Sequence, residues 1–201
     1  TGSVVMSGKR VGFTLTAARP NRVRLETETG DRILIQGYDG IDPPWEFDPG
    51  MEPPRYRQLA DAAGRRIIAD AEFDDPLIAG QERGYAIDFA GETEANGRKY
   101  LRLLVTHRLI ETFSLLIDPG TFLIEFRMES HAGAAGRTVE IVTHYEQYLP
   151  VDGVLLPHEI TTTIDGRVTQ EMKIDRIEPN PAIAPEAFSR PAKASILVPS
   201  R

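Results

Sequence analysis

The side chains that could do chemistry are few, and their spacing fits none of the common catalytic patterns. His158-Glu159 begins like the zinc-protease motif, but the second histidine of that motif would fall at position 162, which is a threonine. His144 and His158 could approach each other across neighbouring strands, yet no carboxylate completes a ligand set at a zinc-site spacing. We interpret both as histidines on strand surfaces and expect no metal.

Other catalytic patterns are also missing. The chain has no G-x-G-x-x-G, P-loop or G-x-S-x-G motif, and Asp74-Asp75 lacks the calcium-loop pattern. The absence of cysteine excludes disulfides, thiolate metal sites and thiol nucleophiles. A β scaffold can bring two acids together for glycoside chemistry, but nothing in the sequence selects a pair. We therefore expect no enzyme, no catalytic residue and no cofactor.

The net charge and the hydropathy of the chain argue against several classes of binding partner. The 201 residues carry a formal net charge of −7, which argues against nucleic acid and against adhesion to anionic membranes. No apolar run approaches the roughly 18 residues of a membrane-spanning helix. The chain opens on Thr1-Gly2-Ser3 without a signal segment.

The elements that would position any site follow a period of two, which is typical of β-strands. Asn96-Gly97, Asp152-Gly153 and Asp165-Gly166 are strong signals for tight hairpin turns. Pro119-Gly120 predicts a further turn. About ten strands are expected, over 10–18, 21–29, 32–38, 85–89, 98–107, 112–118, 121–130, 139–145, 159–164 and 168–177.

One segment follows a helical period instead. Leu59, Ala63 and Ile67 fall on one stripe of 57–71, and a second short turn of helix is expected at 75–79. The segment 39–54 is rich in proline and holds the single tryptophan, Trp45, so irregular backbone is expected there. The tail 181–201 should run extended.

These patterns predict a mainly β fold with minor α in one domain, 1–201. Consecutive hairpins imply a single curled antiparallel sheet, an open or half β-barrel, covered by one or two helices within about 57–79 and by the proline-rich loop. A ligand is another candidate cover. The side chains expected to line its apolar face are Phe13, Leu15, Val23, Leu25, Ile33, Ile35, Ile87, Phe89, Leu101, Leu103, Phe113, Leu115, Phe122, Ile124 and Phe126, with Trp45 and Ile67 from the cover and Ile160, Thr162, Ile164 and Val168 from one wall. Plain core packing is the simpler interpretation at each position.

An ordered set of motifs resembles the LolA/LolB-like family of periplasmic lipoprotein carriers, the outer membrane lipoprotein-sorting group. The set consists of Tyr38-Asp39-Gly40 before Trp45, the helix, Asp75-Pro76-Leu77, Gly91-Glu92 before Gly97-Arg98, Leu116 to Thr121, Tyr148 to Val154, Pro157, Glu178 to Pro181, Phe188 and Pro191. The resemblance implies a half-barrel with helices over its open side, which holds acyl chains in an apolar cavity without catalysis. It also implies an N-terminal helix that this chain does not show, with Thr1-Gly2-Ser3 in the first strand.

Two hypotheses about function remain open. The first, following the resemblance, is a monomeric periplasmic carrier or chaperone that binds the acyl chain of a lipoprotein or lipid for transport. The second is a structural or protein-interaction module of the cell envelope, with envelope proteins as partners and no ligand. A cavity larger than about 300 Å³, the low end for ligand pockets, would favour the first.

Overall fold

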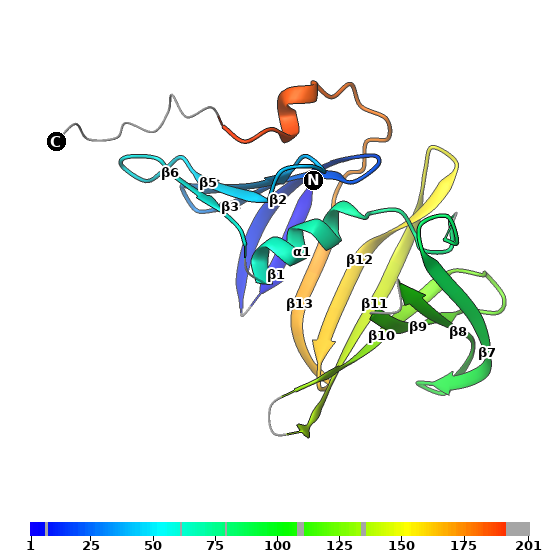
Figure 1. The fold of residues 1–201 in the computed structure, drawn as a ribbon. Helices are drawn as coiled ribbons and strands as arrows, with labels where there is room; N and C mark the ends of the chain where they lie inside the picture. Colours follow the sequence, from blue (N-terminus) through cyan, green and yellow to red (C-terminus); the bar gives the residue numbers. More distant parts are fainter. Residues whose placement is uncertain (7, 61, 79, 108–110, 134–135, 192–201) are drawn as a thin grey trace. The chain divides into compact units, whose positions relative to one another are not determined.

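The computed structural model describes residues 1–6, 8–60, 62–78, 80–107, 111–133 and 136–191. Across this described part, thirteen strands and one α-helix are assigned, with a short 3₁₀ helix near the C-terminal end (Figure 1). The prediction of a mainly β fold is confirmed, although the expected strand number, about ten, was too low. No helix among the described residues is long and apolar enough to cross a membrane.

The strands succeed one another mostly through short turns. Their bounds are β1 Gly2–Met6, β2 Lys9–Ala18, β3 Arg22–Thr29, β4 Arg32–Tyr38, β5 Trp45–Asp48, β6 Arg55–Gln58, β7 Tyr85–Ala95, β8 Arg98–His107, β9 Glu111–Ile117, β10 Ile124–Ala132, β11 Thr138–Val151, β12 Val154–Ile164 and β13 Arg167–Ile174. The helix α1 spans Ala62–Ala71, and the 3₁₀ helix η2 spans Pro185–Phe188.

Hydrogen bonds join the strands into a single antiparallel sheet in the order β6-β5-β4-β3-β2-β1-β13-β12-β11-β10-β9-β8-β7. The three predicted tight hairpins are confirmed, at Asn96-Gly97, Asp152-Gly153 and Asp165-Gly166. Both central residues of each turn have φ between 49° and 83°. Positive φ at both positions matches the twist of the flanking strands, which is why Asn-Gly and Asp-Gly are favoured there.

The proline-rich segment and the helix differ from expectation. Strand β5 forms inside the segment expected to be irregular, because its four residues stand between the proline pairs and pair with β4 and β6. Arg57 and Gln58, expected in the helix, belong to β6. Residues 75–78 form a turn rather than a second helix, and Ala79 lies outside the described residues.

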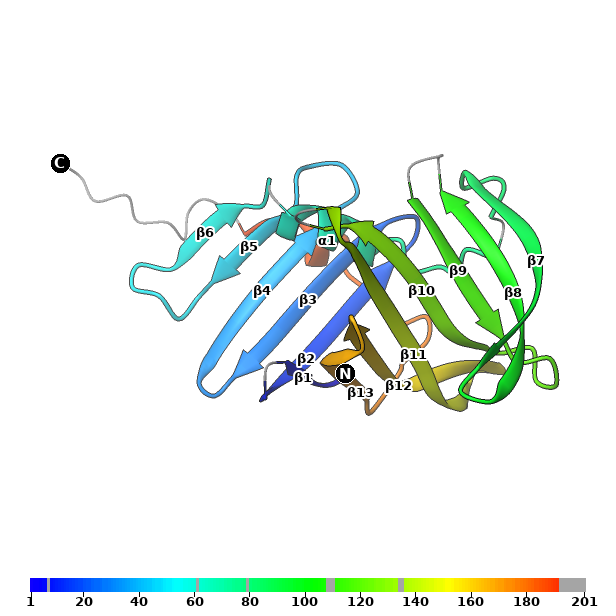
Figure 2. The same cartoon turned by 90° about the horizontal axis from the view of Figure 1, so that it is seen from below.

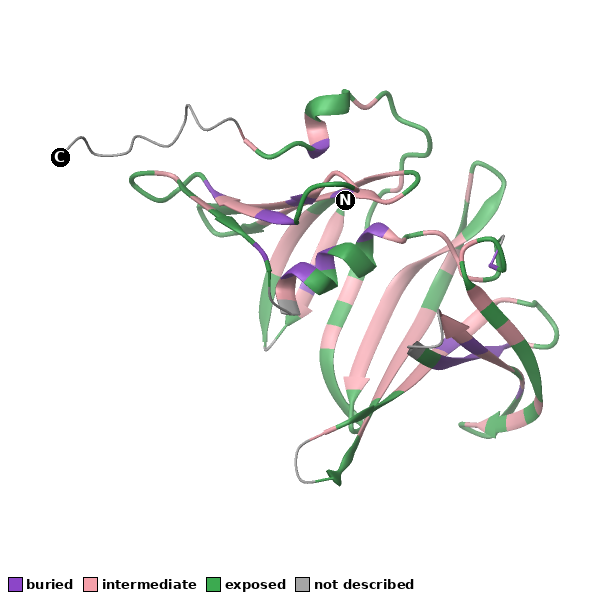
Figure 3. Ribbon diagram, viewed as in Figure 1, coloured by how far each residue is buried: buried purple, intermediate pink, exposed green. Residues whose placement is uncertain are grey.

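The chain divides into two compact units, which we describe separately. The first unit comprises Thr1–Val4, Arg10–Phe73 and the chain from Arg176 onward. Helix α1 packs on β3 and β4 there. Its core is a cluster of Val23, Leu59, Ile67 and Ala71, to which Tyr38 and Ala63 add partly buried surface. Figure 3 shows buried and exposed positions alternating along α1. The predicted helical stripe is therefore buried, although Leu59 precedes the helix.

The second unit comprises Val5–Lys9 and Asp74–Asp175. No α-helix is assigned in the part of it that is described, and apolar clusters lie on both faces of its sheet. Figure 2 shows its long antiparallel strands β7 to β11 in succession. The four consecutive residues Ser114–Ile117 of β9 are all buried, so this strand is covered on both faces.

Candidate functional site

The sheet of the first unit has two faces with different covers. Val23 and Leu25 lie opposite Tyr38 and Gln36 in the register of β3 with β4, and α1 packs on that side. Phe13 and Leu15 share this face, because Leu15 lies opposite Leu25 and Phe13 lies two residues further along β2. Ile67 of α1 is buried against it.

Ile33 and Ile35 lie on the opposite face, which corrects the expectation that all six strand residues of this unit share one face. The pairing of Thr29 with Arg32 sets the register, so odd positions of β3 pair with even positions of β4. Trp45 is on the same side as Ile35, because it lies opposite Gly37.

Trp45 is covered by the C-terminal segment rather than by the helix. Its indole Nε1 donates a hydrogen bond to the carbonyl of Phe188, 3.2 Å away, and both side chains are buried. Arg24 donates to the carbonyl of Ala187, and the Arg22 guanidinium lies over the Phe188 ring. Trp45 therefore anchors η2 on the sheet.

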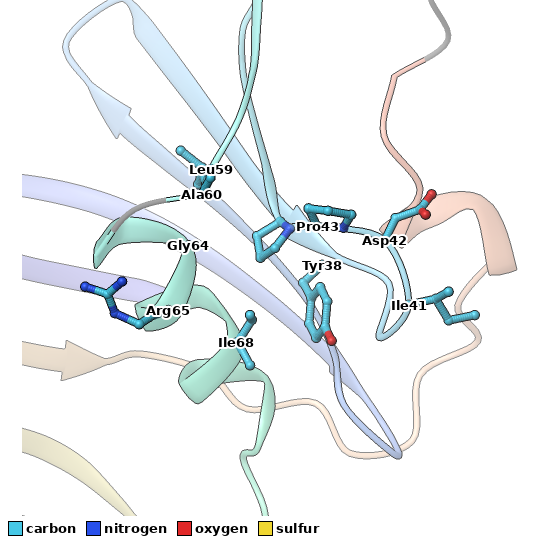
Figure 4. A pocket seen from close by; sticks show the side chains of 10 residues that line it. Tyr38, Ile41, Asp42, Pro43, Leu59, Ala60, Gly64, Arg65 and Ile68 are labelled. Atoms are coloured by element: carbon cyan, nitrogen blue, oxygen red, sulfur yellow. The ribbon is translucent and has the colours of Figure 1, made fainter.

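A pocket of about 300 Å³ opens beside α1 in the first unit (Figure 4). It is lined by Tyr38, Ile41, Asp42, Pro43, Pro44, Leu59, Ala60, Gly64, Arg65 and Ile68. Two hydrogen bonds from the backbone N–H groups of residues 41 and 42 to Asp39 shape its loop side. A Cβ at Gly64 would lie 2.3 Å from the Leu59 carbonyl, so only glycine permits this approach of the helix.

In the second unit, most of the predicted lining residues do share one face, which we name the Leu115 face. Val105, Phe113 and Leu115 form its buried cluster, with partly buried Tyr85, Ile87, Leu103 and Ile124 around them. Leu101 joins them through its pairing with Ile117, and Phe89 through its pairing with Leu103, although Phe89 is mostly exposed.

Phe126 and Phe122 do not belong to the Leu115 face, contrary to the expected alternation of β10. The register of β10 with β9 shifts between Ile124 and Phe126, so Phe126 lies opposite Leu116 and packs with Tyr100 on the other side. Phe122 lies in the turn before β10 with φ 58° and is 72% exposed. The irregularity at Glu125 reverses the faces of the residues that follow it.

The Leu115 face continues over β11, β12 and β13. Ile160 and Ile164 lie on it as predicted, together with Ile141, Tyr145 and Met172, which were not predicted. Ile160, Ile141, Tyr145 and Met172 are partly exposed, and the exposed fraction of Ile164 is slightly higher, at 37%. Ile141 and Tyr145 could have been found by counting the register outward from the Asp152-Gly153 turn. Met172 could not be found by counting from the Asp165-Gly166 turn, because the register of β12 with β13 shifts.

Thr162 and Val168 were predicted to share this wall, but they lie on opposite faces of the sheet. Thr162 lies on the Leu115 face, but Val168 lies opposite Thr163 and is therefore on the other face. The register of β12 with β13 shifts at this point, so alternation alone did not predict the face of Val168.

Polar groups on the Leu115 face are mostly neutral or paired. Arg127 lies 3.9 Å over the Phe113 ring and forms an ion pair with Glu129 at 2.7 Å. Burial raises the pKa of Tyr145, Arg127 lowers it, and the Glu129 and Asp75 carboxylates raise it further, so the phenol stays protonated at neutral pH. The surface around the cluster is therefore apolar with one internally compensated ion pair. Further charges lie on this face at Glu92, opposite Leu101, and at Arg167, opposite Ile164.

A loop covers one end of this face. A Cβ at Gly80 would lie 3.1 Å from Ile87 Cδ1, which places the loop directly over β7. Arg83 fixes its shape by donating hydrogen bonds to the carbonyls of Asp74, Asp75 and Ile78, with its guanidinium over Tyr85. This cover is a loop and not the expected helix.

The two histidines considered for metal binding point to opposite faces of the sheet. His144 lies opposite Thr161 and stacks on Phe126, whereas His158 is three residues from Thr161 and thus on the Leu115 face. No group of three or more histidine or carboxylate side chains in the described part of the chain could hold a metal ion.

Solved structures of other proteins resemble the fold of this chain. No family model and no curated protein matches the chain. Among solved structures, a Vibrio parahaemolyticus domain named as a candidate outer membrane lipoprotein-sorting protein aligns with TM-score 0.60 and 9% identity, over 94% of this chain and 87% of that one. A DUF1329 family protein from Desulfovibrio piger aligns with TM-score 0.56 and 10% identity, over 93% and 86% of the two chains.

A LolA superfamily protein from Nitrosomonas europaea aligns with TM-score 0.43 and 15% identity, over 88% of this chain and 87% of that one. The first two likenesses span nearly the whole of this chain and most of each relative. At such low identities they establish architecture and not activity. The chain has the same fold as the Vibrio parahaemolyticus domain and the Desulfovibrio piger protein.

Proposed function

We propose that the chain is a non-enzymatic carrier or binding protein for the acyl chains of lipoproteins or lipids in the bacterial periplasm. The observation that carries the proposal is the Leu115 face, which extends from its buried cluster across β11 to β13 as partly exposed apolar side chains. The LolA-like fold and the lipoprotein-sorting name of one structural neighbour support the same conclusion.

The chemistry of this face suits a hydrocarbon chain. Each buried methylene contributes about 0.8 kcal/mol, so a long acyl chain needs no directed polar partner. Beside the cluster, Arg127 and Glu129 form an ion pair with each other, and Tyr145 is held in its protonated form. We place the acyl chain along Leu101, Leu103, Phe89, Ile141, Tyr145, Ile160 and Met172. The protein is expected to act as a monomer.

The test compares two neighbouring substitutions on opposite faces of β12. Ile160 and Thr161 are adjacent and both partly buried, but only Ile160 lies on the Leu115 face. Because a charge buried against hydrocarbon is strongly disfavoured, Ile160→Asp should weaken binding of a fluorescent fatty acid at least about tenfold. Thr161→Asp should leave binding unchanged.

The same proteins should be checked by circular dichroism, and native mass spectrometry of the unmodified protein should detect co-purified lipid. If the two folded variants bind the probe equally, the acyl chain does not bind on the Leu115 face. If the unmodified protein neither carries lipid nor binds the probe, the carrier function is wrong.

The alternative is a structural or protein-interaction module of the cell envelope that binds no ligand. Its support is the size of the pocket beside α1, about 300 Å³, which is at the low end of the roughly 300–1,000 Å³ typical of ligand sites. In that case the partly exposed apolar side chains would contact another envelope protein. A failure of both lipid measurements, with a specific protein bound instead, would favour this function.

A further inference from the structure

The hairpin of β11 and β12 extends beyond its neighbours in the sheet. The ladder of β10 with β11 ends at the pair Phe126 and His144, and that of β13 with β12 ends at Lys173 and Glu159. From Tyr148 to Pro157 the two strands continue to pair with each other, as far as Val151 and Val154. The end of the hairpin is therefore a two-stranded ribbon without ladder partners among the described strands.

Both faces of this ribbon carry exposed aliphatic side chains. Leu149 and Val154 lie on one face, since Leu149 is two residues from Val151 and Val151 lies opposite Val154. Leu155 lies on the other face, opposite Pro150. Leu149, Val154 and Leu155 are each about half exposed or more. Aliphatic residues gathered at the end of a hairpin, rather than scattered singly, indicate an interaction surface.

The backbone and charge of the ribbon favour apolar surroundings. Pro150 and Pro157 have no N–H group, which removes one unsatisfied donor from each strand and hinders the addition of another strand. Between Gln147 and Pro157 the single charged side chain is Asp152, at the turn itself. The rest of the segment is Leu, Pro, Val, Gly and Tyr. These residues carry no charge, so moving them out of water does not require a charge to be buried.

We propose that this ribbon end inserts into the surface of an electroneutral lipid layer. A protein partner would cover one face of the ribbon, whereas lipid surrounds both, and both faces here are aliphatic. The net charge of −7 disfavours an anionic lipid surface, and no cluster of basic residues flanks the ribbon. This inference goes beyond acyl-chain binding and does not depend on it, because it concerns the end of the hairpin, beyond the residues along which we place the acyl chain.

The chain offers a matched pair of positions for the test. Val154 and Arg167 each follow an Asp-Gly turn directly, and both are exposed. Because the protein has no cysteine, Val154→Cys and Arg167→Cys can each carry a single environment-sensitive fluorophore. With phosphatidylcholine vesicles, the label at 154 should shift to shorter wavelength and be quenched by a lipid-borne quencher, and the label at 167 should not respond.

A second pair measures the contribution to binding. Val154 and Val168 are each 58% exposed, one at the ribbon end and one beside the other Asp-Gly turn. Val154→Asp should weaken vesicle co-flotation about tenfold or more, because it would place a charge in hydrocarbon, and Val168→Asp should leave it unchanged. Neither exposed position is expected to affect folding.

The proposal is overturned if the unmodified protein fails to float with the vesicles, or if Val154→Asp floats as well as Val168→Asp. It is also overturned if the label at 154 shifts on concentrating the protein without lipid, since the occupant would then be a second copy. The fatty-acid assay of the Ile160→Asp variant is independent of these results. Acyl-chain binding and insertion of the ribbon end can therefore each be refuted without the other.

Discussion

A methyl group added at Gly37 should test the packing of the 3₁₀ helix η2 on the sheet of the first unit. A Cβ at this position would lie 2.4 Å from Trp45 Cζ2 and 2.7 Å from Cε2, well below the roughly 3.5–4.0 Å of an ordinary carbon contact. The indole must therefore move by about 1 Å, and its hydrogen bond to the Phe188 carbonyl must lengthen from 3.2 Å.

The magnitude follows from these two effects. Overpacking costs about 1–3 kcal/mol and a weakened hydrogen bond about 1 kcal/mol, so Gly37→Ala should lower the free energy of unfolding by about 2–4 kcal/mol. Trp45 is the single tryptophan, so its fluorescence during urea unfolding reports on this unit. With a urea slope of about 1–3 kcal/mol/M, the midpoint should fall by about 0.7–4 M.

Gly12→Ala is the matched control, on β2 of the same unit. A Cβ there would lie 3.8 Å from Glu28 Cβ, an ordinary contact. Removing glycine freedom from the unfolded chain should make this variant equally stable or more stable, by about 0.4–1 kcal/mol. Equal urea midpoints for the two variants would refute the close approach of Trp45 to β4.

Three further perturbations are expected to act locally. Burial and the hydrogen bond to Glu125 raise the pKa of Tyr100 from 10.0 to about 12, so its contribution to stability is complete below pH 10 and is lost as the pH rises towards 12; Tyr100→Phe should reduce this pH dependence in urea unfolding. Ile67→Ala should cost about 2–5 kcal/mol, but Ile68→Ala less than about 1, since the exposed fractions are 3% and 39%. Gly166→Ala, at φ 76° with no neighbour within 4 Å, should cost about 1–2 kcal/mol from backbone strain alone, measured by thermal unfolding.

The strands and their turns were largely predictable from the sequence. Alternating side chains reflect a sheet between two environments, and Asn-Gly or Asp-Gly provides the positive φ of a tight turn within two residues. Both signals are local, so the ends of β12 and β13 at Asp165-Gly166 were identified to within one residue, although the start of β12 at Val154 was missed. The short strands β5 and β6 were missed because four residues between prolines carry too little periodicity.

The face of each side chain was less predictable. Ile35 and Leu25 alternate in the same way along their own strands, but the pairing of odd with even positions places them on opposite sides. Phe126 changed face because of one irregular residue in β10, and Val168 because of a shift beside the Asp165-Gly166 hairpin. A shift of one residue exchanges the two faces of a strand, so small irregularities have large consequences for a predicted lining.

The sequence by itself determined the class of fold, the hairpins, the helical stripe and the lack of a recognisable catalytic motif, because each depends on residues close together in the chain. Only the tertiary structure decided which apolar residues form the Leu115 face, why Trp45 packs under η2, and that the hairpin of β11 and β12 ends in an unpaired ribbon. Those features depend on where ladders begin, shift and end, and that is set by packing between segments distant in the sequence.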